Sequence, residues 1–482
     1  MTCTMQLTSR TWWWTLFAIV LVAAVLRVWN LGTFSLWLDE VFTMTAADQP
    51  LAATLATCAQ DAENVPLYAV IANLGLKLGG DETTLRATPI AAGLVSIVLL
   101  AVWTRPHFGP QLALLAAGFA ALSPFHIRYS QELRAYPYLL VVSLLTLLAA
   151  DRLRRRPDRW STLALAATVA VGLYTHLTYL LVLVPAMGLL RLPRDEAPQL
   201  PARVWSRFAL AVGLGLVVFV PWLWIISHNL VERMSRPQTT AWDLVQLGSR
   251  WHVLTVGAWE RDQLGAAAIV VAAIALLGLA VVLRRPVGRL VFLPMVATLV
   301  AWELLLLVLH HWSSSRYATA VWPLLAVLIA VGFHRVLITL RTRPLQILVT
   351  AGMAAVLVAH VGRYYEIGRP HWDALAMAVN DARLEGELVV ANAHWASLCT
   401  AYYLDQRVPT VDGRPDRLAA YLARSPSVLL VSRTLAPPAD LLAVASTVTE
   451  LAFISQTARL YRLERPAEPA RCKPLRRSGT TL

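Results

Sequence analysis

Long apolar runs alternate with short polar connections along most of the chain. A helix needs about 20 mostly apolar residues to cross the hydrocarbon core of a bilayer. The pattern therefore predicts eleven membrane-spanning helices, near residues 12–29, 85–103, 109–124, 137–151, 160–175, 177–191, 208–226, 265–283, 289–309, 319–338 and 344–361.

The connections and the chain after the last run predict the domain organisation. We expect a transmembrane domain over 1–361 with outer loops at 30–84, 125–136, 227–264 and 310–318. The segment 362–465 alternates helical and strand patterns and is expected to form a small extracytoplasmic α/β domain. Its predicted helices are 373–384 and 416–422, and its predicted strands are 387–392, 427–432 and 458–463. The tail 466–482 is expected to be disordered. The expected fold is an α-helical polytopic membrane protein with a C-terminal α/β domain.

Composition agrees with a membrane protein and excludes a single soluble domain. Of the 482 residues, 57% are hydrophobic and 15% are charged, whereas soluble domains carry about 25% charged residues. The formal net charge is +13, but the basic residues stand in short clusters between apolar runs. That distribution is typical of membrane topology and argues against a nucleic acid partner.

The short basic connections predict the orientation, because Arg-rich loops resist translocation. Thirteen Arg residues fall in alternate short loops, and the intervening loops hold only Arg128, Arg134 and Arg316. We therefore expect the N-terminus in the cytoplasm and the C-terminus outside the plasma (inner) membrane. The first apolar run lacks a small-residue cleavage site, so we interpret it as an uncleaved helix rather than a signal peptide.

The first outer loop opens with adjacent carboxylates. Asp39 and Glu40 follow Trp37 within a few residues of a predicted membrane exit. One interpretation is a solvated turn beside an aromatic belt residue. The other is a general base for an acceptor hydroxyl at the mouth of an outward cavity.

The second outer loop holds the densest group of polar side chains: His126, Arg128, Tyr129, Glu132, Arg134 and Tyr136. On a helix, Arg128 and Glu132 form an i,i+4 ion pair, which is the structural interpretation. Such exposed pairs contribute only about 0–1 kcal/mol, so stability alone is a weak reason for so many polar groups at a bilayer edge.

A third outer connection brings Arg316 and Tyr317 after His310 and His311. Arg suits bidentate recognition of phosphate. Glu303, inside the preceding run, should face a polar cavity or an Arg, because an isolated carboxylate in the membrane costs several kcal/mol. The four cysteines, Cys3, Cys58, Cys399 and Cys472, show no zinc-ligand spacing. A disulfide between Cys58 and Cys399 and two free thiols remain alternatives.

These segments, in this order, resemble the GT-C type membrane glycosyltransferases. The resemblance points to family 39, with its aminoarabinose-transferase-like and RgtA/B/C/D-like members, related to protein O-mannosyltransferases. It covers roughly residues 10 to 380 and rests on Leu36–Glu40, Pro66–Tyr68, Leu76–Gly80, Leu85–Arg86, Tyr129–Tyr136, Ser315–Tyr317, Tyr364–Tyr365 and Trp372–Asp373. The chain departs from the family at Val65-Pro66-Leu67-Tyr68-Ala69 and at His371-Trp372-Asp373, which concerns acceptor selection more than the reaction.

The resemblance implies inverting transfer of one sugar from a polyprenyl-phosphate donor to an acceptor hydroxyl of a glycolipid, a cell-envelope glycan or a protein outside the membrane. Asp39 would be the base, with Glu40 and Glu132 as supporting carboxylates. Lys77, Arg86, Arg128, Arg134 and Arg316 would stabilise the leaving phosphate. The substrate-binding candidates are Trp37, Tyr68, His126, Tyr129, Tyr136 and Tyr317.

The sequence leaves two alternatives to consider: the protein could use a metal ion, and it could be a transporter rather than an enzyme. Asp39, Glu40 and Glu132 offer oxygen ligands suited to Mg²⁺ or Mn²⁺, and the resemblance leaves metal dependence open. The rival function is a non-enzymatic transporter or flippase of a lipid-linked sugar. A transporter would place polar groups at mid-membrane and on both faces, whereas here the carboxylates gather on the outer side.

Overall fold

The computed structural model describes residues 8–61, 65–193, 202–235, 244–257, 265–308, 314–367, 371–432, 439–454 and 458–466. The chain divides into two compact units. The first contains Met1–Gly32 and Thr43–Glu366, and the second contains Thr33–Phe42 and Ile367–Leu482. The second unit therefore takes in a segment of the first outer loop as well as the C-terminal part of the chain.

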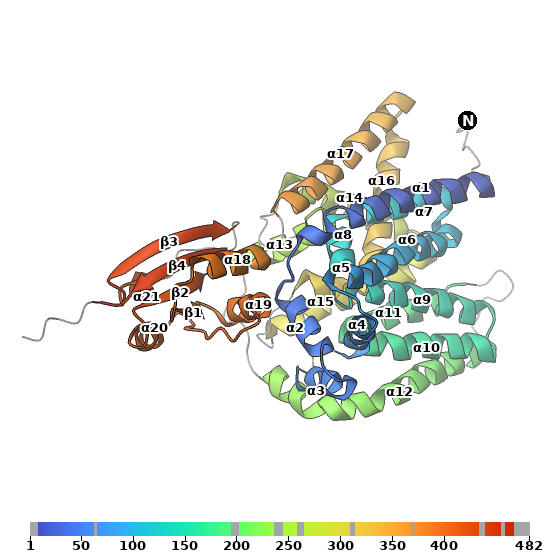
Figure 1. The fold of residues 1–482 in the computed structure, drawn as a ribbon. Coiled ribbons are helices and arrows are strands. Elements are labelled where there is room, and N and C mark those ends of the chain that lie inside the picture. The colour runs from blue at the N-terminus through green and yellow to red at the C-terminus, as the bar shows by residue number, and fades with distance from the viewer. Residues whose placement is uncertain are drawn as a thin grey trace, which may run out of the picture. The chain divides into compact units, whose positions relative to one another are not determined.

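In the part of the chain before residue 368, every regular element of the described ranges is a helix (Figure 1). Its helices are α1 (Ser9–Val28), η1 (Leu31–Thr33), α2 (Leu38–Ala47), α3 (Leu51–Asp61), α4 (Leu67–Lys77), α5 (Glu82–Leu85), α6 (Ala87–Phe108), α7 (Pro110–Leu122), α8 (Pro124–Gln131), α9 (Tyr136–Arg155), α10 (Arg159–Thr175), η2 (Leu177–Tyr179), α11 (Leu180–Leu190), α12 (Ala202–Ser235), α13 (Leu244–Thr255), α14 (Ala266–Val282), η3 (Gly288–Phe292), α15 (Leu293–Val308), η4 (Ser315–Ala318), α16 (Trp322–Thr339) and α17 (Arg343–Ile367).

The helices confirm a multi-pass membrane protein but not the expected number of spans. Seven of the described helices are long and apolar enough to cross a membrane, and α7 with α8 makes an eighth if that bent pair is one span. The difference from eleven comes from helix length. The predicted spans 160–175, 177–191 and 265–283 correspond to α10, α11 and α14, with 17, 11 and 17 residues. These are shorter than the roughly 20 residues that a straight crossing needs.

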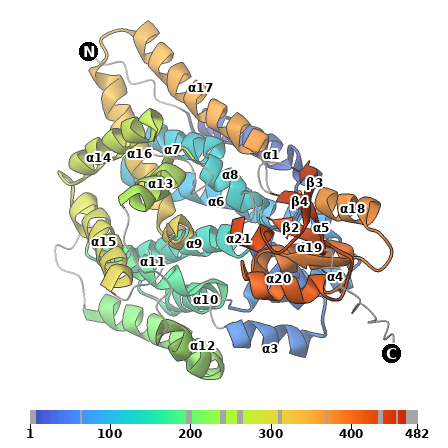
Figure 2. The same cartoon turned by 90° about the vertical axis from the view of Figure 1, so that its left-hand side faces the viewer.

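Helices α14 and α16 pack closely in the first unit and lie side by side in Figure 2. A Cβ atom added at Gly278 would lie 1.9 Å from the carbonyl oxygen of Leu328, and one added at Gly332 would lie 1.8 Å from that of Ile274. Only glycine permits such an approach. Small residues that let two backbones touch are a common way to pack helices in membranes.

The second unit contains a four-stranded sheet. Its elements are α18 (Trp372–Ala382), β1 (Leu388–Ala391), α19 (His394–Leu404), α20 (Pro415–Leu422), β2 (Ser427–Ser432), α21 (Ala439–Leu442), β3 (Thr447–Ile454) and β4 (Ala458–Glu464). The strand order is β1-β2-β4-β3. β1 pairs with β2 in parallel, with Val390 opposite Leu430, and the other two pairs are antiparallel. The predicted α/β character is confirmed, and β2 has the predicted bounds.

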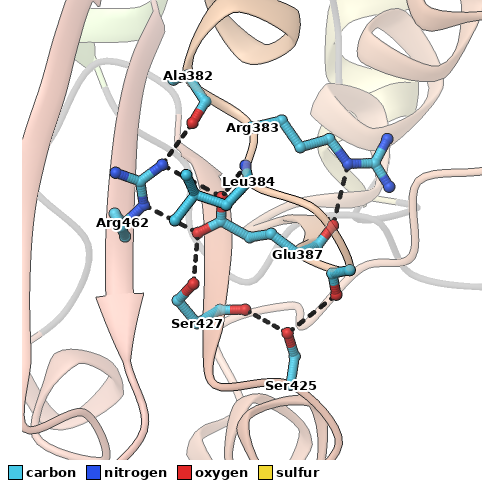
Figure 3. A network of polar contacts seen from close by, with 8 residues as sticks. Ala382, Arg383, Leu384, Glu387, Ser425, Ser427 and Arg462 are labelled. Carbon is cyan, nitrogen blue, oxygen red and sulfur yellow. Dashed lines mark hydrogen bonds and ion pairs between the residues drawn. The ribbon is translucent and has the colours of Figure 1, made fainter.

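Apolar side chains form the core around the sheet, and one buried carboxylate joins several of its elements by hydrogen bonds. β2 is buried along its whole length. Glu387, just before β1, accepts hydrogen bonds from Arg462 Nε (2.9 Å), Ser427 Oγ (2.7 Å) and the backbone N–H of Leu384 (3.0 Å). Figure 3 shows Arg462 and Ser427 directed at this carboxylate. Burial raises the pKa of Glu387, but these bonds outweigh burial and leave the pKa below its ordinary value.

Candidate functional site

Helix α8 carries three of the candidate residues and begins at a break in an apolar helix. The chain bends by 59° between α7 and α8. Ser123 has extended backbone angles, and its hydroxyl accepts from the backbone N–H of His126. Pro124 fills the first helical position, where a missing N–H costs nothing. The Ser-Pro pair thus ends one helix, begins the next and places His126, Arg128 and Tyr129 on a short buried helix.

The predicted ion pair between Arg128 and Glu132 is confirmed. Arg128 Nε donates to Glu132 Oε1 at 2.9 Å, and the two side chains are 9% and 0% exposed. Arg128 also lies over the ring of Tyr129, with its guanidinium carbon 5.2 Å from the ring centre. Two charges buried this deeply are costly unless each supports the other. The pair is therefore a fixed part of the structure rather than a surface contact.

Arg134 and Arg316 belong to separate segments, and both affect the imidazole of His176. Burial, with the added positive charges of Arg134 and Arg316, lowers the pKa of His176 to about 3. Arg134 Nη1 donates to the hydroxyl of Thr43 at 3.2 Å. Arg316, on η4, lies 5.8 Å from the ring centre of Tyr317. Two guanidinium groups thus approach the same neutral ring, although 182 positions separate them in sequence.

An aromatic row connects α8 with His176. The rings of Phe125 and Tyr129 are 4.7 Å apart, those of Tyr129 and Tyr136 are 4.8 Å apart, and Tyr136 is 5.8 Å from His176. The first two pairs are edge-on, and such pairs are favourable by about 0.5–1.5 kcal/mol each. The row thus links Tyr129, which Arg128 covers, with Tyr136 at the start of α9 and with His176.

Asp39 and Glu40 lie in the second unit, in the first turn of α2. Glu40 is fully buried, and Asp39 and Trp37 are partly buried. The backbone N–H of Trp37 donates to Glu40 Oε2 at 3.3 Å. Carboxylates in the first turn of a helix are stabilised by the positive end of the helix dipole.

The same segment is fastened to the C-terminal elements of its unit. The backbone N–H of Leu36 donates to the phenolic oxygen of Tyr403 on α19 at 2.7 Å. The hydroxyl of Ser35 bonds the carboxylate of Asp373, whose own backbone N–H donates back to Ser35 at 3.2 Å. Burial, with the negative charges of Asp39 and Glu40, raises the pKa of Cys399 to about 12. The acids are thus held against α18 and α19.

The remaining candidates surround the first outer loop within the first unit. Arg86 is buried, and its Nη1 donates to the carbonyl oxygen of Leu31 at 3.1 Å. Tyr68, on α4, lies 5.5 Å from the ring of Tyr138. Lys77, in the last turn of α4, is exposed. That all these candidates share one pocket with Asp39 remains a prediction.

Sequence reasoning missed Arg27, a fully buried cation near the end of α1. Its guanidinium donates to the carbonyl oxygens of Ala120 (3.1 Å) and Ala121 (3.2 Å) at the end of α7. It also lies 2.8 Å from Nδ1 of His126, whose Nε2 lies 2.9 Å from the hydroxyl of Ser96. Arg27 therefore caps the broken helix, and both ring nitrogens of His126 are engaged by the protein. The available signal was an Arg inside an apolar run, which is rare unless it has a partner.

Further predictions from the sequence concern Glu303, the cysteines and a metal ion. Glu303 accepts from Arg250 Nη1 at 3.0 Å, as expected of a carboxylate in an apolar run. Cys58 and Cys399 are buried free thiols. His310, His311, Trp312, Ser313, Trp259, Cys3, Cys472 and the tail 467–482 lie outside the described residues. Over the described ranges no three His, Cys, Asp or Glu side chains gather to hold a metal ion.

A protein family and several solved structures are similar to this chain. Residues 63–225, about a third of the chain, match the family described as dolichyl-phosphate-mannose-protein mannosyltransferase. The fold is similar to that of ArnT from Cupriavidus metallidurans in the apo state, with a TM-score of 0.58 and 14% identity over 94% of this chain and 98% of ArnT. The predicted resemblance to GT-C type membrane glycosyltransferases is confirmed.

Two further structures share the GT-C type fold. The first is ArnT from the same organism bound to undecaprenyl phosphate, with a TM-score of 0.56 and 15% identity over 94% of this chain and 98% of that one. The second is the apo oligosaccharyltransferase of Archaeoglobus fulgidus, with a TM-score of 0.53 and 13% identity over 89% of this chain and 70% of that one. At these identities the likeness concerns the fold. No curated protein sequence matches the chain.

Proposed function

We propose that the protein is an integral membrane glycosyltransferase that moves one sugar from a polyprenyl-phosphate donor to an acceptor hydroxyl. Two comparisons support the donor class: the matched family is described by its dolichyl-phosphate-mannose donor, and one similar structure holds undecaprenyl phosphate. The observation that carries the proposal lies within the first unit. A buried Arg128–Glu132 pair stands in the same unit as Arg134 and Arg316, and the charges of both these Arg residues lower the pKa of His176.

The chemistry of this arrangement suits a phosphate leaving group. Attack of the acceptor oxygen on the anomeric carbon forms the new glycosidic bond and breaks the bond to the phosphate oxygen. Negative charge then grows on the departing polyprenyl phosphate, where fixed guanidinium groups stabilise it. Arg134 and Arg316 suit this role best, because each is only partly buried and Arg offers several donors to phosphate oxygens.

Asp39 takes the proton of the acceptor hydroxyl in this proposal, and back-side attack inverts the anomeric carbon. A carboxylate can act as the base only if it is ionised and within hydrogen-bond reach of that hydroxyl. Asp39 lies in the first turn of α2 and is partly exposed, so an acceptor hydroxyl can approach its carboxylate. Glu40, which is fully buried and bonded to the backbone of Trp37, supports the turn.

The other candidate residues either contact the substrates or support the fold. We assign Tyr129, Tyr136, Tyr317, Tyr68 and Trp37 to substrate contact, because aromatic faces stack on sugars and on lipid chains. Arg86 and His126 support the fold, since Arg86 donates to the carbonyl oxygen of Leu31 and the two ring nitrogens of His126 contact Arg27 and Ser96. Arg128 holds Glu132, and exposed Lys77 lies where it can meet a donor head group.

The reaction takes place outside the plasma membrane in this proposal. The Arg-rich short loops face the cytoplasm, so the N-terminus is cytoplasmic and the C-terminal α/β unit is extracytoplasmic. Acceptors on that side are glycolipids, cell-envelope glycans and proteins.

The decisive experiment uses the purified full-length protein with a polyprenyl-phosphate sugar radiolabelled in the sugar. A glycosyltransferase releases polyprenyl phosphate and moves the label to an acceptor, or to water when no acceptor is present. A flippase in sealed vesicles moves the labelled lipid across the bilayer with its sugar still attached. Translocation of intact donor with no cleavage under any acceptor would overturn the proposal in favour of the transporter.

A further inference from the structure

A cavity of about 690 Å³ lies in the first unit where α6, α14 and α16 end and α7 begins. Its walls are Phe108–Leu112 at the junction of α6 and α7 together with residues at the ends of α14 and α16: Val281, Val282, Arg284, Arg285, Val331, His334, Arg335 and Ile338. Gly278 and Gly332, which bring α14 and α16 into close contact, stand near these lining residues in sequence.

Cations dominate the polar lining. Arg284, Arg285 and Arg335 all line the cavity and are exposed, and His334 lies beside them. No Asp or Glu is among the described lining residues. Within the described ranges none of the three guanidinium groups forms an ion pair or a hydrogen bond with the protein. The cavity therefore concentrates positive side-chain charge that no described acidic side chain neutralises.

The start of α7 adds backbone donors to the same cavity. The helix begins at Pro110 after Gly109, which has a φ of 94° and supplies no side-chain cap. A Cβ added at Gly109 would meet nothing within 4 Å, so the space in front of the helix is open. The first N–H groups of a helix lack partners inside it, and such termini bind phosphate groups.

The remaining lining is apolar. Val281, Val282, Val331 and Ile338 stand beside the cations. A free anion needs no such surface, whereas a phospholipid presents a phosphate directly above hydrocarbon. Basic pockets between transmembrane helices bind anionic lipid head groups for this reason.

A plainer explanation is that these Arg residues only anchor the helix ends and complement their dipoles. The helix ends beside Arg341 and Arg343 provide a comparison, because these residues are also exposed and basic and do not line the cavity. Simple anchoring predicts the same behaviour for both sets of Arg.

We propose that this cavity binds the phosphate of an anionic phospholipid. Arg284, Arg285 and Arg335 contact the phosphate together with the start of α7, and the valine surface receives the acyl chains. The site is distinct from the candidate active site. Helix α6 runs 22 residues from Arg86 to this cavity, about 33 Å at 1.5 Å per residue. The proposal is thus independent of the glycosyltransferase function.

The test measures the thermal unfolding midpoint of the purified full-length protein in non-ionic detergent with three additives. These are phosphatidylglycerol, phosphatidylcholine and inorganic phosphate. A ligand that binds only the folded state raises the midpoint. Of the three additives, we expect only phosphatidylglycerol to raise the midpoint of the wild type and of the control R341Q/R343Q. The variant R284Q/R285Q/R335Q should lose that shift.

Each other outcome overturns a part of the proposal. A triple variant that keeps the wild-type shift, or a wild type that responds equally to phosphatidylcholine, excludes an anionic-lipid site. An equal response to inorganic phosphate shows a free-anion site instead. Loss of the shift in R341Q/R343Q reduces the effect to general surface charge. The single exposed change Arg335→Gln guards against misfolding of the triple variant, and a full wild-type shift in R335Q also contradicts the site.

Discussion

The backbone N–H of Leu36 donates a 2.7 Å hydrogen bond to the phenolic oxygen of Tyr403, three residues before Asp39. A residue of the C-terminal unit thus holds the segment that carries the proposed base. Tyr403 is a positioning residue in this arrangement, because its oxygen is occupied by the backbone of the segment.

Tyr403→Phe should lower kcat by about 2- to 10-fold, the equivalent of one neutral hydrogen bond of about 0.5–1.5 kcal/mol. The donor KM should change little, since the donor phosphate is bound by other residues. The control Tyr421→Phe removes a phenol oxygen from α20 of the same unit and should leave kcat unchanged. Equal kcat values for Y403F and wild type would show that the bond does not orient Asp39.

Asp39→Asn should reduce sugar transfer by about 10²- to 10⁴-fold, the contribution expected of a positioned general base. The amide keeps the size of the side chain and removes its basicity, so donor binding should persist. Transfer rates and donor binding of the purified variant are to be compared with those of Asp48→Asn, which changes an exposed acid of the same outer loop. Full turnover in folded D39N would rule out Asp39 as the base.

Glu132→Gln should both destabilise the protein and impair transfer. It leaves the guanidinium of Arg128 buried without its counter-ion, and breaking such a pair costs about 3–5 kcal/mol. The double change R128M/E132M removes both charges and should recover much of the unfolding midpoint but not the transfer rate. If activity returned together with stability, the pair would be structural only.

Cys399 should report on its acidic neighbours through its reactivity. Its pKa of about 12 keeps the thiol protonated at pH values where an ordinary cysteine, with a pKa of about 8.5, forms thiolate. Alkylation of the native protein should therefore be slow and should become faster in Asp39→Asn, because one of the raising charges is gone. Peptide mass spectrometry measures the rate at each cysteine.

Cys58 serves as the internal reference for that measurement. Burial, followed by the charge of Asp61, raises its pKa to about 11, and Asp39 is not among the charges acting on it. Its alkylation rate should be the same in both proteins. An unchanged rate at Cys399 would contradict the closeness of Asp39 to this thiol.

The Glu387–Arg462 pair should make the second unit acid-sensitive. The pKa of Glu387 is below its ordinary value in the folded protein. Its stabilisation is therefore complete above the unfolded pKa of about 4.3 and is lost as the pH falls through the folded pKa. Amide hydrogen exchange of β2 in the full-length protein should speed up below about pH 4.

Glu387→Gln should expose β2 to exchange at neutral pH and flatten this acid dependence. The control Glu385→Gln changes an exposed carboxylate two residues earlier and should keep the wild-type profile. An E387Q variant with the wild-type acid profile would assign the acid sensitivity to other groups.

Local sequence signals predicted much of the fold. The alternation of apolar runs with Arg-rich loops predicted the helical membrane unit, and the short apolar run between Ser427 and Ser432 predicted β2 with its bounds. Helix α19 was missed because its apolar residues surround the helix axis rather than forming one face. The expected eleven spans remain unconfirmed, because apolar composition does not reveal where α10, α11 and α14 end.

Contacts between distant segments account for most of what the sequence could not provide. Arg128 and Glu132 are four residues apart, so helix geometry alone predicted their pairing. The meeting of Arg134 and Arg316 at His176, and the binding of Ser35 and Leu36 to α18 and α19, depend on tertiary packing across hundreds of residues. Arg27 was hidden for the same reason, since its partners lie about 95 positions away.

The path of the chain between the two units has a practical consequence. Residues 33–42 leave the helical unit, join the C-terminal one and return at Thr43. A protein cut after Glu366 would keep every apolar helix yet lose the groups that fasten Leu36 and Ser35. Truncation or domain exchange at that boundary is thus expected to disable the enzyme, and engineered chimaeras need to carry residues 33–42 from the donor of the C-terminal unit.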